Sequence, residues 1–289
     1  MSDFLQLVIS GLGQGTIYGL VAIGFVVIFT VSGVVNLVQG EFAILAGFTA
    51  ISLLGMGVPL VLAMVIGVAV VGGFSMGMQR LAIAPVRRMT VLTSIILTLG
   101  ISTALKGAML LYWGPEAQSL PALPGSHLHI AGVTIRAQEV WIFAVGALLA
   151  GAVIWFYERT LAGKALLACS EQPVAARLVG IAPGRARRNA FLIAGVVGGV
   201  AGVLASPIYF TSWEAGLVLG LKGFVAAVLA GLISVRGAMI GGLVLGVLEN
   251  LTAGYVDSGL RDAVAFIVLV VVLVARPSGV FARETEERV

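Results

Sequence analysis

Charged side chains inside otherwise apolar stretches are the residues of this sequence that could do chemistry. Glu41, Lys106, Lys222 and Glu249 each interrupt such a stretch. A charge at the depth of a bilayer costs about 3 kcal/mol even on lenient insertion scales, so these side chains should face a cavity or a partner. Two interpretations stay open: they line a polar path for a solute, or they pair and snorkel to stabilise the fold.

Polar residues accompany these charges and extend the candidate path. Asn36 and Gln39 precede Glu41 between a long apolar run and a short one, a pattern typical of a helix broken within the membrane. Pro207 and Asn250 interrupt later apolar runs. The candidate substrate-pathway residues are therefore Asn36, Gln39, Glu41, Pro207, Lys222, Glu249 and Asn250.

Catalytic and metal-binding patterns are weak in this sequence. Residues 73–77 fit G-x-S-x-G, but Ser75 has no base nearby, because the only histidines, His127 and His129, lie in a separate polar loop. We therefore favour a packing role for Ser75 over a membrane enzyme. Two histidines in a loop are a weak metal signal, and the chain contains no G-x-x-x-x-G-K-[ST]. We predict no catalytic residue, no metal ligand and no cofactor in this chain.

The longest hydrophilic interruption, residues 158–188, contains six of the 17 Lys and Arg residues. Apolar residues interleave with these charges, which predicts short amphipathic helices. One part of the loop combines small residues with apolar ones and could insert into a groove on another protein. The residues of this docking segment are Ala175, Ala176, Arg177, Leu178, Gly180 and Ile181.

The composition places most of the chain in lipid. Hydrophobic residues make up 60% of it, charged residues 10%, and the mean hydropathy is +1.11. A soluble domain of 289 residues could not bury so much apolar surface. The net charge of +4 does not indicate a nucleic-acid partner, because most Lys and Arg residues fall in the loops assigned to the cytosol, as the positive-inside rule expects. The single Cys169 excludes an intramolecular disulfide.

The apolar segments predict an all-α polytopic bundle of about eight to nine membrane segments, some of them discontinuous, in one transmembrane domain over residues 1–289. We expect an external loop at 114–138 and a cytosolic loop at 158–188. The expected segments are Leu5 to Val31, Phe42 to Met56, Leu60 to Met78, Val91 to Trp113, Val140 to Tyr157, Ala190 to Ser206, Gly216 to Val235, Ala238 to Tyr255 and Ala263 to Ala275.

Two patterns bear on how these segments pack. Glycines recur at four-residue spacing, as at Gly11, Gly15 and Gly19, which lets membrane helices approach closely. Residues 39–47 resemble residues 222–231, which is what an inverted repeat of the kind found in transporters would produce.

Three stretches of the chain resemble a known family. They are residues 15–20 leading into 33–42, residues 175–181, and residues 206–231 continued through 241–249. In these stretches the chain is similar to the permease subunits of branched-chain amino acid ABC importers, in the LivH-like branch. One departure concerns the docking segment, because Val174 stands where the family usually has a glutamate.

The resemblance implies a function without catalysis in this chain. Two permease subunits, identical or homologous, would form a pore in the bacterial cytoplasmic membrane, and each would seat its docking segment in one of two cytosolic ATPase subunits that hold ATP and magnesium. An external binding protein would deliver a branched-chain amino acid or a similar small molecule. Glu41, Lys222 and Glu249 at membrane depth keep an ion- or proton-coupled secondary transporter open as the alternative.

Overall fold

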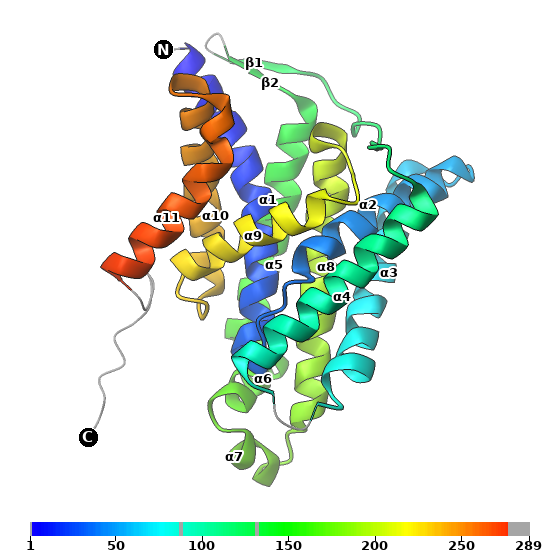
Figure 1. Ribbon diagram of the computed structural model, residues 1–289, viewed down its shortest axis with the longest axis vertical. Coiled ribbons are helices and arrows are strands. Elements are labelled where there is room, and N and C mark those ends of the chain that lie inside the picture. Colours follow the sequence, from blue (N-terminus) through cyan, green and yellow to red (C-terminus); the bar gives the residue numbers. More distant parts are fainter. Residues whose placement is uncertain (1, 87–88, 131–132, 277–289) are drawn as a thin grey trace.

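The computed structural model describes residues 2–86, 89–130 and 133–276, and these form a bundle of helices (Figure 1). Arg87, Arg88 and the charged tail after Arg276 lie outside the described residues. The helices are α1 (Ser2–Ser32), α2 (Gln39–Gly55), α3 (Leu60–Met78), α4 (Val91–Trp113), α5 (Ala137–Arg159), α6 (Leu161–Glu171), α7 (Pro173–Leu178), α8 (Pro183–Tyr209), α9 (Ala215–Leu229), α10 (Val235–Tyr255) and α11 (Arg261–Ala275), with a π-helical turn at Gln79–Ile83 and a 3-10 turn at Ser258–Leu260.

The predicted all-α polytopic membrane bundle is confirmed. In the described part of the chain, 7 helices are long and apolar enough to cross a membrane. Besides α6, two further apolar helices are shorter, α2 with 17 residues and α9 with 15. At 1.5 Å per residue they reach about 26 and 22 Å, less than a hydrocarbon core of about 30 Å. The short α2 agrees with the half-spanning segment expected from the sequence, whereas α9 was expected as part of a full span.

Helix α9 ends earlier than expected. Its last residue is Leu229 and α10 begins at Val235, so the expected single span from Gly216 to Val235 is wrong. The chain turns at Gly231 and Leu232, whose φ angles of 77° and 60° are left-handed and end the helix. The side chain of Ser234 then accepts a hydrogen bond from the backbone of Gly237 and starts α10.

Several other boundaries also differ from the expectation, and α8, for example, begins at Pro183 rather than Ala190. Helix α2 begins at Gln39 rather than Phe42, so Gln39 and Glu41 belong to its first turn and the break itself covers residues 33–38. Helix α8 continues past Pro207 to Tyr209, so Pro207 does not end the span. The proline removes one backbone donor from the last turn, and the helix ends two residues later.

Glycine contacts explain why α1 lies at the centre of the bundle. A Cβ added to Gly15 would lie 2.7 Å from the carbonyl oxygen of Gly242, and one added to Gly246 would lie 2.3 Å from the backbone nitrogen of Gly15. Only glycines permit this approach of α1 to α10, which confirms the close helix contact predicted from the glycine spacing. Helices α8, α9 and α5 cover the other sides of α1.

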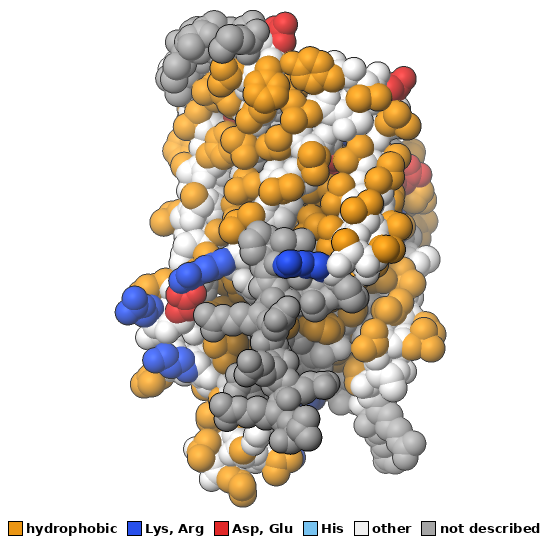
Figure 2. Space-filling view, turned by 90° about the vertical axis from the view of Figure 1, so that its left-hand side faces the viewer, with side chains coloured by type: hydrophobic (Ala, Val, Ile, Leu, Met, Phe, Trp, Pro, Cys, Tyr) orange, Lys and Arg blue, Asp and Glu red, His pale blue; other side chains and the backbone are white. Residues whose placement is uncertain are grey.

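The two long loops lie at opposite ends of the bundle (Figure 1). Residues 114–136 include a hairpin of β1 (Leu128–Ile130) and β2 (Val133–Ile135), held over the start of α1 by hydrogen bonds between the Gln6 side chain and the backbone of Thr134. Residues 160–182 carry α6 and α7, which protrude at the other end. We call these the hairpin end and the α7 end. On the face in Figure 2 the described Lys and Arg side chains gather towards the α7 end.

The inverted repeat stays a prediction. The first of the two similar stretches starts at Gln39, the first residue of α2, whereas the second starts at Lys222, halfway along α9. Helices α2 and α9 do pack together, because a Cβ on Gly40 would lie 1.9 Å from the carbonyl oxygen of Gly216.

Candidate functional site

The break between α1 and α2 crosses the interior without helical hydrogen bonds, and α4 supplies the missing partners. The Oγ1 atom of Thr98 accepts a hydrogen bond from the Leu37 amide and donates one to the Val35 carbonyl, both at 3.2 Å. The Ser94 hydroxyl accepts one from the Val35 amide at 3.4 Å. Non-helical backbone at membrane depth requires such partners. Sequence reasoning missed these hydroxyls, although Ser94, Thr98 and Ser102 recur at four-residue spacing in an apolar helix.

Asn36 and Gln39 are both fully buried at this break. The Oδ1 atom of Asn36 accepts a hydrogen bond from the Val38 amide at 3.3 Å, which shapes the turn into α2. The Gln39 side chain donates to the Ala194 carbonyl at 2.9 Å and so ties α2 to α8. Within the described residues, Nδ2 of Asn36 and Oε1 of Gln39 have no hydrogen-bond partner.

Glu41 lies where α2, α4 and α9 meet. Its Oε1 atom accepts a hydrogen bond from Ser102 at 3.0 Å and lies 4.0 Å from the ammonium of Lys106. Its Oε2 atom packs against Gly216, where an added Cβ would come within 2.1 Å, and it has no hydrogen-bond partner among the described residues. The structure therefore places Lys106, which the sequence analysis left outside the candidate path, beside Glu41.

A second group of charges forms around Lys222 of α9. Its Nζ atom lies 3.0 Å from Oε2 of Glu249 on α10 and 2.7 Å from Oδ1 of Asp262 on α11. The same atom lies 3.2 Å from the hydroxyl of Tyr18 on α1, and that hydroxyl donates to Glu249 at 2.8 Å. Lys222 and Glu249 are buried, so each needs the other to offset the loss of water.

Gln14 joins this group to Asn250 and to Arg261. Its Oε1 atom accepts hydrogen bonds from the Asn250 amide at 2.8 Å and from the Arg261 guanidinium. Its Nε2 atom donates to Glu249 at 3.2 Å and contacts the Tyr18 hydroxyl. Sequence reasoning missed Gln14 and Tyr18, whose four-residue spacing in α1 was a usable signal. It also missed Asp262 and Arg261, which open α11 and had no visible partner in the sequence.

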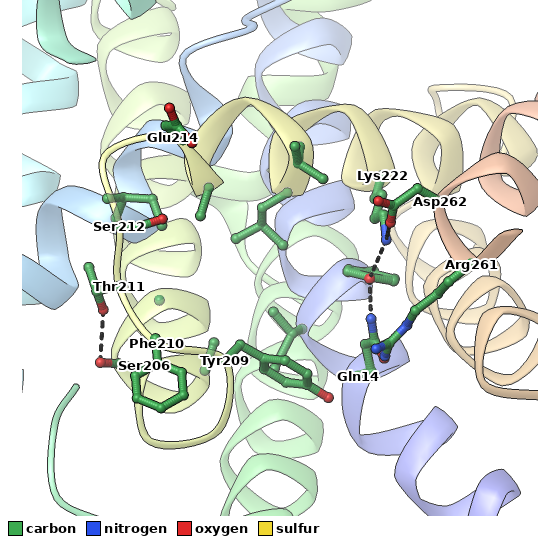
Figure 3. A pocket seen from close by; sticks show the side chains of 18 residues that line it. Gln14, Ser206, Tyr209, Phe210, Thr211, Ser212, Glu214, Lys222, Arg261 and Asp262 are labelled. Atoms are coloured by element: carbon green, nitrogen blue, oxygen red, sulfur yellow. Dashed lines mark hydrogen bonds and ion pairs between the residues drawn. The ribbon is translucent and has the colours of Figure 1, made fainter. Parts of the chain in front are cut away.

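A cavity of about 410 Å³ lies beside this network (Figure 3). Lys222, Asp262 and Arg261 lie on one side of it, and Ser206, Thr211 and Ser212 on the other. The apolar part of the cavity wall includes Ile17, Ile44, Val218 and Leu219. The segment carrying Thr211 is pinned to the long loop by backbone hydrogen bonds to Gln118 of 2.9 and 2.6 Å.

The predicted pathway residues separate into groups in the structure. Lys222 lines the cavity, and Glu249 and Asn250 support that wall through Lys222 and Gln14. Asn36, Gln39 and Glu41 are buried at the contact of α2 with α4, α8 and α9 instead. Pro207 is half-buried one residue after Ser206, and the cavity wall includes Ser206 but not Pro207 in the part of the chain that the structure describes.

The docking segment forms α7 and the turn after it. The helix ends in a Schellman motif, with Gly180 at a φ of 84°, its amide bonded to Arg177 and the Ile181 amide bonded to Ala176. Ala176 is buried against the bundle, whereas Ala175 and Arg177 are exposed. Val174, Leu178 and Val179 are 72%, 85% and 75% exposed, so the protruding face of α7 is apolar.

Ser75 serves packing, as the sequence analysis favoured. Its hydroxyl donates to the Phe191 carbonyl at 2.7 Å, and a Cβ on Gly195 would lie 2.3 Å from it. These contacts join α3 to α8. Across the described residues, no three His, Cys, Asp or Glu side chains are grouped as a metal site would require.

Comparisons with known proteins identify the family. The family described as "Branched-chain amino acid transport system / permease component" matches residues 7–273. The chain is 33% identical to the high-affinity branched-chain amino acid transport system permease protein LivH of Salmonella typhimurium (strain LT2), with 99% of this chain and 98% of the relative aligned. It is also 33% identical to the permease protein BraD of Pseudomonas aeruginosa, with the same coverage.

More distant relatives extend the comparison. A probable branched-chain amino acid transport permease protein LivH of Methanocaldococcus jannaschii is 27% identical over 90% of this chain and 87% of its own length. No solved structure matches the chain. Given the family match over nearly the whole chain and the long apolar helices, this multi-pass membrane protein belongs to the family of branched-chain amino acid transport system permease components.

Proposed function

We propose that this chain is the membrane subunit of an ATP-driven importer for branched-chain amino acids or similar small zwitterions. It would work in the cytoplasmic membrane of a bacterium with a second permease subunit, an external binding protein and two cytosolic ATPase subunits. ATP and magnesium would be held by those ATPase subunits. The names of the relatives support the substrate class, and the contacts below support the mechanism.

The cavity that Lys222 lines suits such a substrate. Its apolar residues match a branched hydrocarbon side chain, while Lys222 and Asp262 offer charges for an α-carboxylate and an α-ammonium. Pockets that combine apolar walls with a few placed polar groups are typical small-molecule sites. Thr211 is bonded to the loop at the hairpin end, which this proposal assigns to the outer side, where a binding protein would deliver substrate.

The α7 face suits a partner on the cytosolic side. Helix α7 protrudes at one end of the bundle (Figure 1) and its apolar residues are exposed, so we expect its face to bind protein rather than lipid. Val174 replaces the acidic residue that the family usually carries, so docking here would depend on apolar contact and not on an ion pair at that position.

One continuous helix joins these two places, and this observation carries the proposal. Helix α8 begins at Pro183, directly after the docking segment, and its last turn supplies Ser206 and Tyr209 to the cavity wall. Its 27 residues extend for about 40 Å as a rigid rod. A movement of α7 imposed by an ATPase would therefore reach the substrate cavity through α8.

The test compares two equally exposed leucines at the α7 end. Leu178 of α7 is 85% exposed and Leu161 of α6 is 86% exposed. In proteoliposomes containing the complete transporter, Leu178→Ser should lower ATP-driven uptake of leucine about tenfold or more, since it removes apolar docking area, whereas Leu161→Ser should change it less than about twofold. Equal effects of the two would contradict the docking assignment.

The same system tests the alternative. We expect the isolated chain in liposomes to show no uptake under a proton or sodium gradient, because the proposed transport is driven by ATP hydrolysis on the partner subunits. Gradient-driven uptake by the isolated chain would instead establish the ion-coupled transporter suggested by the charges at membrane depth.

A further inference from the structure

A second cavity lies towards the α7 end and takes no part in the transport path described above. Its volume is about 400 Å³, close to the 410 Å³ of the first. It lies between α1, α5, α6 and the turn that joins α9 to α10. Its apolar lining residues are Val27, Ile154, Leu167, Ile233 and Val235.

Two of its hydroxyl groups are buried without a partner. The hydroxyl of Tyr157, a residue only 5% exposed, and that of Thr30 have no hydrogen-bond partner among the described residues. Leaving a buried hydroxyl unsatisfied costs about 1–3 kcal/mol. A ligand with polar atoms would recover part of that cost.

A charge pair that is partly exposed to solvent also lines the cavity. The Nη2 atom of Arg236 lies 2.5 Å from Oε2 of Glu158, and both residues line the cavity. A guanidinium has five N–H donors and a carboxylate two acceptor oxygens, so the pair keeps capacity for a ligand. Because the pair is neutral overall, it fits a molecule that carries both charges better than a phosphate or an anionic headgroup.

We propose that this cavity is a second, cytosolic-side binding site for a zwitterionic amino acid with an apolar side chain. The α-carboxylate would bind Arg236 and the Tyr157 hydroxyl, and the α-ammonium would bind Glu158 and the Thr30 hydroxyl. The hydrocarbon side chain would pack among the apolar lining residues. The first cavity offers the same combination, with Lys222 and Asp262 as its charge pair.

The position of the site gives it a regulatory consequence, which rests on the proposed function. Leu167 of the cavity wall belongs to α6, which packs against the docking helix α7. A ligand wedged between α1, α5 and α6 would hold α6 in its present position and oppose any movement of α7. Since a ligand stabilises the state that it binds best, a rising internal concentration of the imported amino acid would slow further import.

The experiment measures leucine binding and transport by the complete transporter. In nanodiscs without the external binding protein, titration of labelled leucine should show two sites for the wild type. Tyr157→Phe and Arg236→Gln should each weaken one of them about tenfold or more. Arg159→Gln serves as the matched control, because this exposed arginine ends α5 but does not line the cavity as the structure describes it.

In proteoliposomes, leucine enclosed with ATP should reduce the initial uptake rate of the wild type and of Arg159→Gln about fivefold. For Tyr157→Phe and Arg236→Gln, the initial uptake rate with internal leucine should stay close to the rate of the same variant without it. Equal inhibition of all four proteins, no inhibition of any, or a response to phosphatidylglycerol content in place of leucine would overturn the proposal. Absence of ATP-driven uptake together with intact two-site binding would refute the proposed function and leave this site standing.

Discussion

Lys222 connects four helices, since it lies on α9 and its ammonium contacts Tyr18 of α1, Glu249 of α10 and Asp262 of α11. Such a residue could be structural, or it could meet substrate in the cavity it lines. A second substitution that removes the partner charge distinguishes the two roles, because it restores stability in both cases but restores uptake only if Lys222 is structural. Removing one partner of a buried pair leaves the other charge uncompensated, whereas removing both charges does not.

We therefore expect Lys222→Met to destabilise the protein by about 3–5 kcal/mol and to abolish uptake, because buried Glu249 then keeps only Arg261, at 4.0 Å, as a cationic partner among the described residues. The double variant Lys222→Met with Glu249→Gln should recover most of the stability but not the uptake. Thermal unfolding in detergent and ATP-driven uptake by the complex measure the two effects. Recovery of uptake in the double variant would show that the network only holds the helices together.

Glu41 and Lys106 face each other at 4.0 Å, but their surroundings differ, since the side chain of Glu41 is fully buried and that of Lys106 is 20% exposed. A partly exposed partner at that distance contributes little. We expect Glu41→Gln to lower uptake about tenfold, equivalent to about 1.4 kcal/mol in the barrier. Lys106→Met should lower it less than about twofold. Equal, small effects in the uptake assay would show both charges to be structural.

At the scale of the elements, the contact of α1 with α10 depends on glycine. The α-carbon of Gly15 would lie 2.4 Å from a Cβ placed on Gly246. Since this neighbour is backbone, it cannot move away as a side chain could. The close contact brings Gln14 and Tyr18 of α1 within hydrogen-bond distance of α10, so the seam also positions the charge network.

Gly246→Ala should accordingly destabilise the protein by about 1–3 kcal/mol, as overpacking does. Gly107 of α4 is the matched control, because an added Cβ there meets nothing within 4 Å. Gly107→Ala should be neutral or stabilising by up to about 1 kcal/mol, the difference in helix propensity. Unfolding of the two purified variants compares them directly, and equal stabilities would contradict the packing assigned to the seam.

The hairpin end and the α7 end of the molecule should lie on opposite sides of the membrane, and cysteine labelling can test this. The single cysteine, Cys169, is buried, so the unmodified chain should react little with a membrane-impermeant maleimide. In a Cys169→Ser background, Glu116→Cys in the hairpin-end loop should be labelled in intact cells. Leu178→Cys should be labelled only after the membrane is opened. Labelling of Leu178→Cys from outside would invert the topology and refute the docking of α7 on a cytosolic ATPase.

Hydropathy by itself determined most of the membrane segments. The bounds expected for α3 and α4 agree with those observed, because an apolar run between polar or proline-containing turns must become a helix when no water is present to bond its backbone. The resemblance to the permease family is likewise confirmed. The membrane segments and the family both follow from short stretches of sequence, so they could be predicted without knowing which residues meet in space.

Tertiary structure decided where the polar residues go. Gln39 and Glu41 resemble a loop in sequence and yet begin α2, because Ala194, Ser102 and Gly216 from other helices surround them. The partners of Lys222 lie at sequence distances that no motif spans, and burial selects them since an unpaired charge in lipid is too costly. The sequence thus determined which segments are in the membrane, and packing alone decided which charges meet and where the cavities form.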